Sequence, residues 1–225
     1  MFIVGSIIGS FMNVLIYRIP KNIGFIKGRS YCPSCHHMIA WYDLIPFVSY
    51  LFLKGKCRHC HQKISISYPI IELLAGVLLV GITYCYPRRL EALLLYLLIA
   101  TLVVMSKIDM DTNQVYHCLL LWLCMIGIVY QFIYGTSFKE CLQSMLCVSL
   151  FLWIVTKIVP DSFGMGDIYL YGIIGLFLSW QDCVLSFYIA VLTGSVYGLL
   201  KMGQEKQIPF VPFISLGVLV CLFLV

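Results

Sequence analysis

Long apolar stretches dominate this chain, and short polar connections separate most of them. Several of the stretches are close to the ~17 residues that a helix needs to cross a bilayer. The first one lacks a basic N-terminal region and a small-x-small cleavage site, so we expect a transmembrane helix there rather than a signal peptide. The pattern predicts about eight transmembrane helices, over residues 2–17, 69–86, 90–106, 115–134, 141–158, 168–181, 183–200 and 208–225.

Composition supports the same class of protein. The chain has 225 residues, of which 61% are hydrophobic and 11% are charged, and its mean hydropathy is +0.96. A soluble domain is usually about half apolar and about a quarter charged. These values exclude a soluble globular protein, a disordered tail and a secreted disulfide scaffold. The predicted fold class is therefore an all-α polytopic membrane protein.

Lysine and arginine residues determine the predicted orientation, because cytoplasmic loops are enriched in them. With the N-terminus outside and eight alternating spans, 12 of the 15 basic residues fall inside, whereas Arg88, Arg89 and Lys139 fall outside. The long polar segment 18–68 is thus expected in the cytoplasm. The C-terminus is expected outside, unless one of the short spans is a re-entrant hairpin. The net charge of +5 reflects this topology and does not indicate nucleic-acid binding.

The cytoplasmic segment carries two Cys-x-x-Cys pairs, Cys32 with Cys35 and Cys57 with Cys60. Each pair places two thiolates on one side of a tight turn, and two such pairs complete the tetrahedron of a four-thiolate zinc site. Four cysteine ligands leave no open position on the metal for catalysis. We therefore predict a zinc centre formed by these four residues, whose role is to fold a loop that is too small to have its own core.

Two other cysteine chemistries fit the same residues. A histidine follows each pair, His36 or His61, and Cys-x-x-Cys-His is the attachment pattern of c-type haem. A membrane dihaem electron carrier and a membrane thiol oxidoreductase are thus alternatives. Both chemistries need the outer face of the membrane, whereas the charge distribution places this loop inside. The histidines are expected to be exposed loop residues, with a metal-ligand role as the alternative.

Acidic residues lie at the predicted cytoplasmic ends of two spans. Asp109 and Asp111 follow the third span, and Asp167 precedes the sixth, where it ends a Gly-x-Gly-Asp sequence. The alternation of spans brings Asp109 and Asp167 to the same side of the membrane. Two close carboxylates share a proton, so that one accepts a proton from water while the other donates to a scissile carbonyl. This arrangement predicts an aspartic protease; the alternative is a set of interfacial acids that cap helix ends.

Three further residues have expected supporting roles. Gly164 and Gly166 are expected to let the backbone bend and a peptide approach closely. Glu72 lies one turn into the second span, where it is expected to bind a substrate amine, to support the loop, or only to lie at the interface with its acidic end in water.

Taken in order, the motifs of the whole chain resemble those of the type IV prepilin peptidases, which are polytopic aspartyl proteases with a Gly-x-Gly-Asp motif. The resemblance covers nearly the full length. It is carried by the paired cysteines and by residues 9–14, 46–50, 55–57, 68–73, 108–111, 164–167 and 208–213.

The resemblance implies an activity and a substrate. Asp109 and Asp167 would be the catalytic residues, and the substrates would be prepilins or pseudopilins, cut after a glycine on the cytoplasmic side of the inner or plasma membrane. Members with the cysteine loop usually also methylate the new N-terminal residue with S-adenosylmethionine. We therefore predict both activities, with a protease that has only a structural zinc loop as the alternative. The predicted division is a first transmembrane helix at 1–17, a zinc loop with the methyltransferase part at 18–68, and a transmembrane protease domain at 69–225.

Two departures from the family pattern concern the surroundings of the aspartates. A Leu-Pro-Asp-like stretch usually follows the first catalytic segment, and Val115, Tyr116 and His117 stand there instead. The lysine usual two residues after the second aspartate is Tyr169. Neither change removes a catalytic carboxylate, but both alter the environment in which the carboxylates act.

Overall fold

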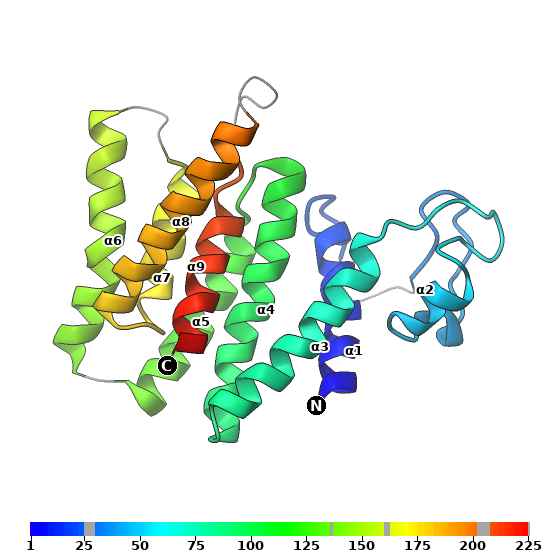
Figure 1. Cartoon of the computed structure of the whole chain (residues 1–225), viewed down its shortest axis with the longest axis horizontal. Coiled ribbons are helices and arrows are strands. Elements are labelled where there is room, and N and C mark those ends of the chain that lie inside the picture. The colour runs from blue at the N-terminus through cyan, green and yellow to red at the C-terminus, as the bar shows by residue number, and fades with distance from the viewer. Residues whose placement is uncertain (25–29, 136, 160–162, 202–207, 225) are drawn as a thin grey trace. The chain divides into compact units, whose positions relative to one another are not determined.

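The computed structural model describes residues 1–24, 30–135, 137–159, 163–201 and 208–224, and the described chain is helical (Figure 1). Two isolated bridges are its only extended pairing, so the predicted all-helical class is confirmed. The chain divides into two compact units, Met1–Tyr84 and Cys85–Val225. Lys27, Arg29 and Lys206, which contribute to the predicted charge asymmetry, lie outside the described residues.

The first unit contains two long helices and a loop region. Its elements are α1 (Phe2–Arg18), the short 3₁₀ helix η1 (Trp41–Leu44), α2 (Val48–Phe52) and α3 (Ser67–Cys85). Helices α1 and α3 approach closely at Gly5 and Gly9, which are four residues apart. A Cβ atom at Gly5 would lie 2.7 Å from the carbonyl oxygen of Ala75, and one at Gly9 would lie 2.7 Å from the Cα atom of Glu72. Small residues at this spacing allow two membrane helices to pack backbone against backbone.

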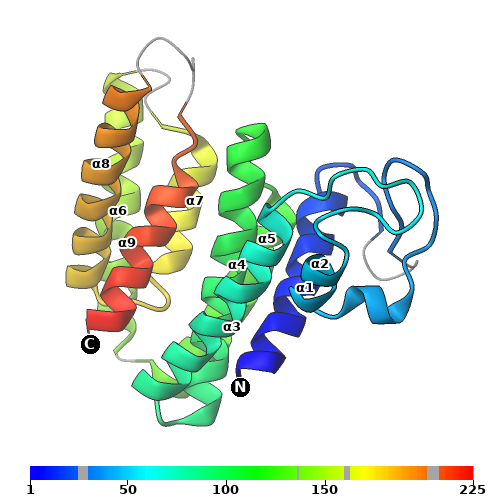
Figure 2. The same cartoon turned by 45° about the vertical axis from the view of Figure 1, so that its right-hand side comes forward.

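The described residues of the second unit form a bundle of six helices. They are α4 (Arg89–Thr112), α5 (His117–Tyr134), α6 (Phe138–Ile158), α7 (Met165–Ile174), α8 (Trp180–Leu200) and α9 (Val211–Leu224). Helix α9 packs against both α4 and α8, and it lies between them in Figures 1 and 2. A hydroxyl pair, Ser106 on α4 and Ser215 on α9, joins two of these helices with an Oγ–Oγ distance of 2.6 Å. The last helix of the chain therefore packs directly on the helix that carries Asp109.

Among the described residues, five helices are long and apolar enough to cross a membrane: α3, α4, α5, α6 and α8. Helices α1, α7 and α9 are apolar but shorter. Only 17% of the most apolar window of α6 or α8 is buried inside the protein, as expected for helices that face lipid. The chain is thus a multi-pass membrane protein, while the count of eight spans stays a prediction.

The predicted end of the third span is too early. Helix α4 continues to Thr112, so Asp109 and Asp111 lie in its last turns rather than after it. The helix ends where Asn113 adopts a left-handed conformation with φ of 51° and donates its N–H to the carbonyl of Asp109 over 2.7 Å. Asparagine tolerates this conformation better than most residues. The last turns of the helix are polar, so the helix can extend beyond the apolar stretch from which its end was predicted.

The predicted sixth span, 168–181, is also wrong in its bounds. Helix α7 begins at Met165, so Asp167 lies in its first turn, and the helix ends at Ile174. The chain turns after Gly175, where a Cβ atom would lie 2.6 Å from the backbone of Met145 on α6. The next helix begins at Trp180, capped by the Ser179 hydroxyl, which accepts the N–H of Asp182. A local turn and a cap thus divide a continuous apolar sequence.

Candidate active site and metal centre

Asp109 lies in the last turns of α4 and is only 5% exposed. Its Oδ2 atom accepts the backbone N–H of Val211 over 3.0 Å. Val211 is the first residue of α9, and the first N–H groups of a helix have no partner within that helix. The Asp109 side chain therefore caps α9 from a neighbouring helix, which fixes the orientation of the carboxyl group.

Asp167 is 8% exposed and lies in the first turn of α7, where its N–H donates to the carbonyl of Gly164 over 3.1 Å. Its carboxyl group is close enough to that of Asp109 to interact electrostatically with it. The segments before the two helix starts also meet, because the rings of Phe163 and Phe210 are 5.3 Å apart between centroids. The structure thus brings together two buried aspartates that are 58 residues apart in the sequence.

The two glycines of the Gly-x-Gly-Asp sequence are not needed for the backbone to bend. Gly164 has φ of −71° and ψ of 144°, which any residue can adopt, so the backbone does not need glycine in order to bend there. At Gly166, a Cβ atom would lie 2.6 Å from the Cβ atom of Val115. Gly166 therefore allows close packing against the chain segment after α4, and the approach of a peptide to these glycines stays a prediction.

This contact predicts that Gly166→Ala reduces peptidase activity more than Gly164→Ala does. The added methyl group at position 166 must displace Val115 or the start of α7, at a cost of about 1–3 kcal/mol, and Asp167 is the next residue. At position 164 the added Cβ atom has 3.3 Å to the nearest atom, an oxygen of Asp167. Initial cleavage rates of both variants, compared at equal amounts of folded protein, measure the difference; equal rates would contradict the packing role.

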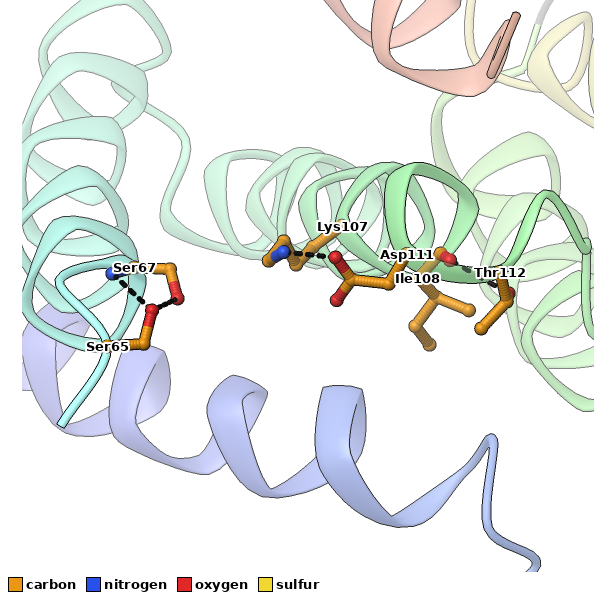
Figure 3. Close-up of polar contacts among 6 residues, drawn as sticks. All are labelled: Ser65, Ser67, Lys107, Ile108, Asp111 and Thr112. Atoms are coloured by element: carbon orange, nitrogen blue, oxygen red, sulfur yellow. Dashed lines mark hydrogen bonds and ion pairs between the residues drawn. The ribbon is translucent and has the colours of Figure 1, made fainter. Parts of the chain in front are cut away.

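Asp111 has different surroundings from Asp109. Its side chain is 48% exposed and forms an ion pair with Lys107, one turn earlier on α4 (Figure 3). Thr112 beside it donates its hydroxyl to the carbonyl of Ile108 over 2.9 Å. The same view draws Ser65 and Ser67 of the first unit, whose hydroxyls are 2.8 Å apart just before and at the start of α3. Asp111 is thus a surface residue with its own partner.

The four cysteines of the predicted metal centre converge. The Sγ atoms of Cys32, Cys35, Cys57 and Cys60 all lie within 4.8 Å of one another, in an arrangement that could hold a metal ion. The Sγ atoms of Cys32 and Cys60, which come from different pairs, are 3.8 Å apart. With Zn–S bonds of ~2.3 Å, the edge of a regular tetrahedron is also ~3.8 Å. The donor set and its spacing therefore fit zinc.

Both cysteine pairs are built in the same way. In each, the residue after the second cysteine, His36 or His61, has φ of 55° and donates its N–H to the carbonyl of the first cysteine. Glycine adopts this left-handed conformation more readily than histidine does. Both histidines are exposed, as predicted. The described metal-binding group contains only cysteines, so the ligand role for a histidine has no support.

Hydrogen bonds favour the thiolate form of Cys32, which is the form that binds metal. Burial raises the pKa of this thiol, but hydrogen bonds from the backbone of Cys35 and Ser34 and from the thiols of Cys35 and Cys57 outweigh burial and lower its pKa to about 6. Arg58, inside the second pair, forms a two-bond ion pair of 2.6 and 2.8 Å with Asp43, and this keeps the pKa of Asp43 below its usual value. Arg58 thereby joins the second cysteine pair to η1.

Zinc binding should depend on these cysteines and not on the others. We expect Cys60→Ser to lower the zinc content well below one ion per chain, because a hydroxyl is a weaker ligand than a thiolate. Cys147→Ser, a matched change at a half-buried cysteine of α6, should leave the metal content unchanged. Elemental analysis of purified protein measures both, and equal zinc content in the two variants would contradict the four-thiolate site.

Two connections at the site were not predicted from the sequence. The first is the hydrogen bond from the N–H of Val211 to Asp109. The second is the hydrogen bond from the N–H of Phe47 to the Oε2 atom of Glu72 on α3, over 2.7 Å. Phe47 has φ of 47°, a conformation that is rare for a bulky residue. Glu72 thus supports the loop, which was one of its expected roles. The two N–H donors, Phe47 and Val211, lie in the family motifs at 46–50 and 208–213. These motifs were the only indication in the sequence that the two donors matter.

Two family models match the chain. Residues 3–86 match the bacterial peptidase A24 N-terminal domain, and residues 96–199 match the type IV leader peptidase family. The four cysteines lie in the first match and the two buried aspartates in the second. No solved structure matches the chain.

Curated relatives have names that agree with this family. Proteins named prepilin leader peptidase/N-methyltransferase from Burkholderia pseudomallei and Bacillus subtilis are each 30% identical, over 98% and 96% of this chain and 83% and 90% of their own lengths. A protein of the same name from Myxococcus xanthus is 31% identical over 90% of this chain, which spans 62% of that relative. The chain therefore belongs to the type IV leader peptidase family, and the resemblance seen in the sequence is confirmed.

Proposed function

We propose that this protein cleaves the leader peptides of prepilins or pseudopilins, with Asp109 and Asp167 as the catalytic pair, and that it methylates the new N-terminus. The observation that supports the peptidase site best is the meeting of two buried carboxyl groups from distant segments. Membership of the type IV leader peptidase family and the names of the relatives support the reaction and the substrate. An aspartate pair that only capped helix ends would not need both members to be buried together.

The proposed cleavage uses one carboxylate as base and one carboxylic acid as proton donor. The base takes a proton from a water molecule, whose oxygen attacks the carbonyl carbon of the leader glycine, while the acid gives its proton to the carbonyl oxygen. The carbon–nitrogen bond then breaks as a proton passes to the leaving amine. Val211 holds Asp109 in one orientation through its N–H, so the pair is already positioned before the peptide arrives.

The four-cysteine group is proposed to bind zinc as a structural ion. Four thiolates complete the coordination of the metal and leave no place for water. Haem attachment would use each cysteine pair for a separate porphyrin, whereas here the two pairs converge on one centre. We expect the bound metal to fix the positions of both turns, because the loop that joins them has few buried apolar residues.

The N-methyltransferase activity is proposed to use S-adenosylmethionine, which carries a reactive methyl group on a positively charged sulfur. The predicted division into a first helix at 1–17, a methyltransferase part at 18–68 and a protease domain at 69–225 belongs to this proposal. We place the protein in the inner or plasma membrane with both activities at the cytoplasmic face, on the basis of the lysine and arginine distribution.

One assay tests the proposed function. The purified protein in detergent is mixed with a prepilin whose basic leader ends in glycine, with and without S-adenosylmethionine, and the products are analysed by mass spectrometry. We expect a cut after the glycine in both reactions, and one added methyl group on the mature N-terminus only with the donor. Cleavage without methylation would identify a peptidase with a structural zinc loop, and an uncut prepilin would reject the proposal.

A further inference from the structure

A cavity of about 470 Å³ lies within the first unit. Helix α1, the start of α3, the segment with η1 and α2, and both cysteine pairs all contribute to its wall. Cys32 and Cys57 are among the lining residues, so folding of the cysteine loop and formation of the cavity are linked. Its volume is within the range of sites that enclose a small molecule, about 300–1,000 Å³.

The acidic residues that line the cavity are Asp43 and Glu72, and they differ in their partners. Asp43 is neutralised by Arg58 through the two-bond ion pair. Glu72 is half-buried, accepts the N–H of Phe47, and lies within hydrogen-bonding reach of the Ser10 hydroxyl. Within the described part of the chain no lysine or arginine forms an ion pair with Glu72. The cavity thus contains a carboxyl group whose polar partners are neutral.

The wall also contains the basic residues Arg18, Arg58 and Lys63, and its aromatic part suits a flat, partly apolar ligand. Four tyrosines line the cavity. They come from α1, from the residue before the first cysteine pair, from α2 and from the start of α3, and are Tyr17, Tyr31, Tyr50 and Tyr68 in that order. Aromatic rings bind cations on their faces and stack on purine bases. A ligand that joins a purine to a positive charge would match both features of this wall.

We infer that this cavity is the binding site of the methyl donor, with Glu72 facing its positive charge. The inference rests on the proposed N-methyltransferase activity and assigns a place to it. S-adenosylmethionine combines an adenosine with a sulfonium cation and is small enough for the cavity. Its demethylated product, S-adenosylhomocysteine, has the same adenosine but a neutral sulfur. The carboxyl group of Glu72 therefore favours the positively charged molecule, while stacking of the adenine on the aromatic wall holds both molecules.

Binding of the two molecules to the full-length protein in detergent tests this assignment. Isothermal titration of the wild type should give tighter binding of S-adenosylmethionine. Glu72→Gln should weaken that binding about tenfold, which is about 1.4 kcal/mol, and change the binding of S-adenosylhomocysteine little. Glutamine retains an oxygen that can accept the N–H of Phe47, and zinc content reports whether the loop is intact. Glu140→Gln, the same change on the exposed first turn of α6, should have no effect.

A second variant tests the cavity without changing its charge. Ala40 lines the cavity, and Ala40→Trp should fill part of it and weaken the binding of both molecules, while cleavage and zinc content are kept. If the wild type methylates its substrate but neither Glu72→Gln nor Ala40→Trp affects donor binding, the donor binds elsewhere and the inference is wrong, although the proposed function stands. If the wild type neither binds the donor nor methylates, the inference and the methyltransferase activity are both rejected.

Discussion

Asp109→Asn and Asp167→Asn are each expected to abolish prepilin cleavage, with a loss on the order of 10²–10⁴-fold for the removal of one acid–base group. An amide can neither take the proton from water nor donate one to the carbonyl oxygen. Asp111→Asn should keep most of the activity, because Asp111 is exposed and paired with Lys107. Initial rates of leader removal in detergent measure all three variants.

The variants can be separated from folding defects. Asparagine at position 109 still offers a side-chain oxygen to the N–H of Val211, so the contact between α4 and α9 should persist and the thermal stability should change little. Full cleavage by Asp109→Asn, or a loss in Asp111→Asn as large as in the other two, would show that the wrong carboxyl groups were assigned.

The positions of the helices could be predicted from the sequence because apolar length is what a bilayer selects. Each described helix of ten or more residues lies mainly within one predicted stretch, although the start of α8 also falls in the stretch predicted before it. Their ends could not be predicted, because they depend on contacts outside the stretch. Helix α7 ends where Gly175 meets the backbone of α6, and α4 ends at a single left-handed residue, Asn113.

The two parts of the candidate site were predictable to different degrees. The cysteine pairs are local, since each turn is made by a few consecutive residues and repeats the same hydrogen bonds, so spacing alone indicated a common centre. The surroundings of Asp109 are not local. Its partner Val211 is 102 residues away, and no spacing rule connects them. The packing of Gly166 against Val115 is likewise a tertiary contact, which explains why the sequence suggested a different role for that glycine.

The two activities are expected to separate by mutation. Asp167→Asn should block cleavage, yet still allow a methyl group to be added to a substrate whose leader has already been removed. Cys60→Ser should do the reverse, with methylation reduced much more than cleavage. The physical reason is that the four cysteines lie in one compact unit and the two aspartates in the other. Metal binding folds the loop, whereas packing in the membrane holds the helices of the second unit.

The comparison needs two substrates and one control protein. An intact prepilin reports cleavage, a pre-cut pilin reports methylation alone, and the mass of the mature N-terminus shows whether a methyl group was added. Cys147→Ser, outside the cysteine cluster, should retain both activities and serves as the matched control for Cys60→Ser. Partial loss of cleavage in Cys60→Ser is compatible with a loop that helps to orient the leader. Complete loss of cleavage in protein that is still folded would mean that the cysteine loop belongs to the peptidase site, and the separation into two activities on two units would be wrong.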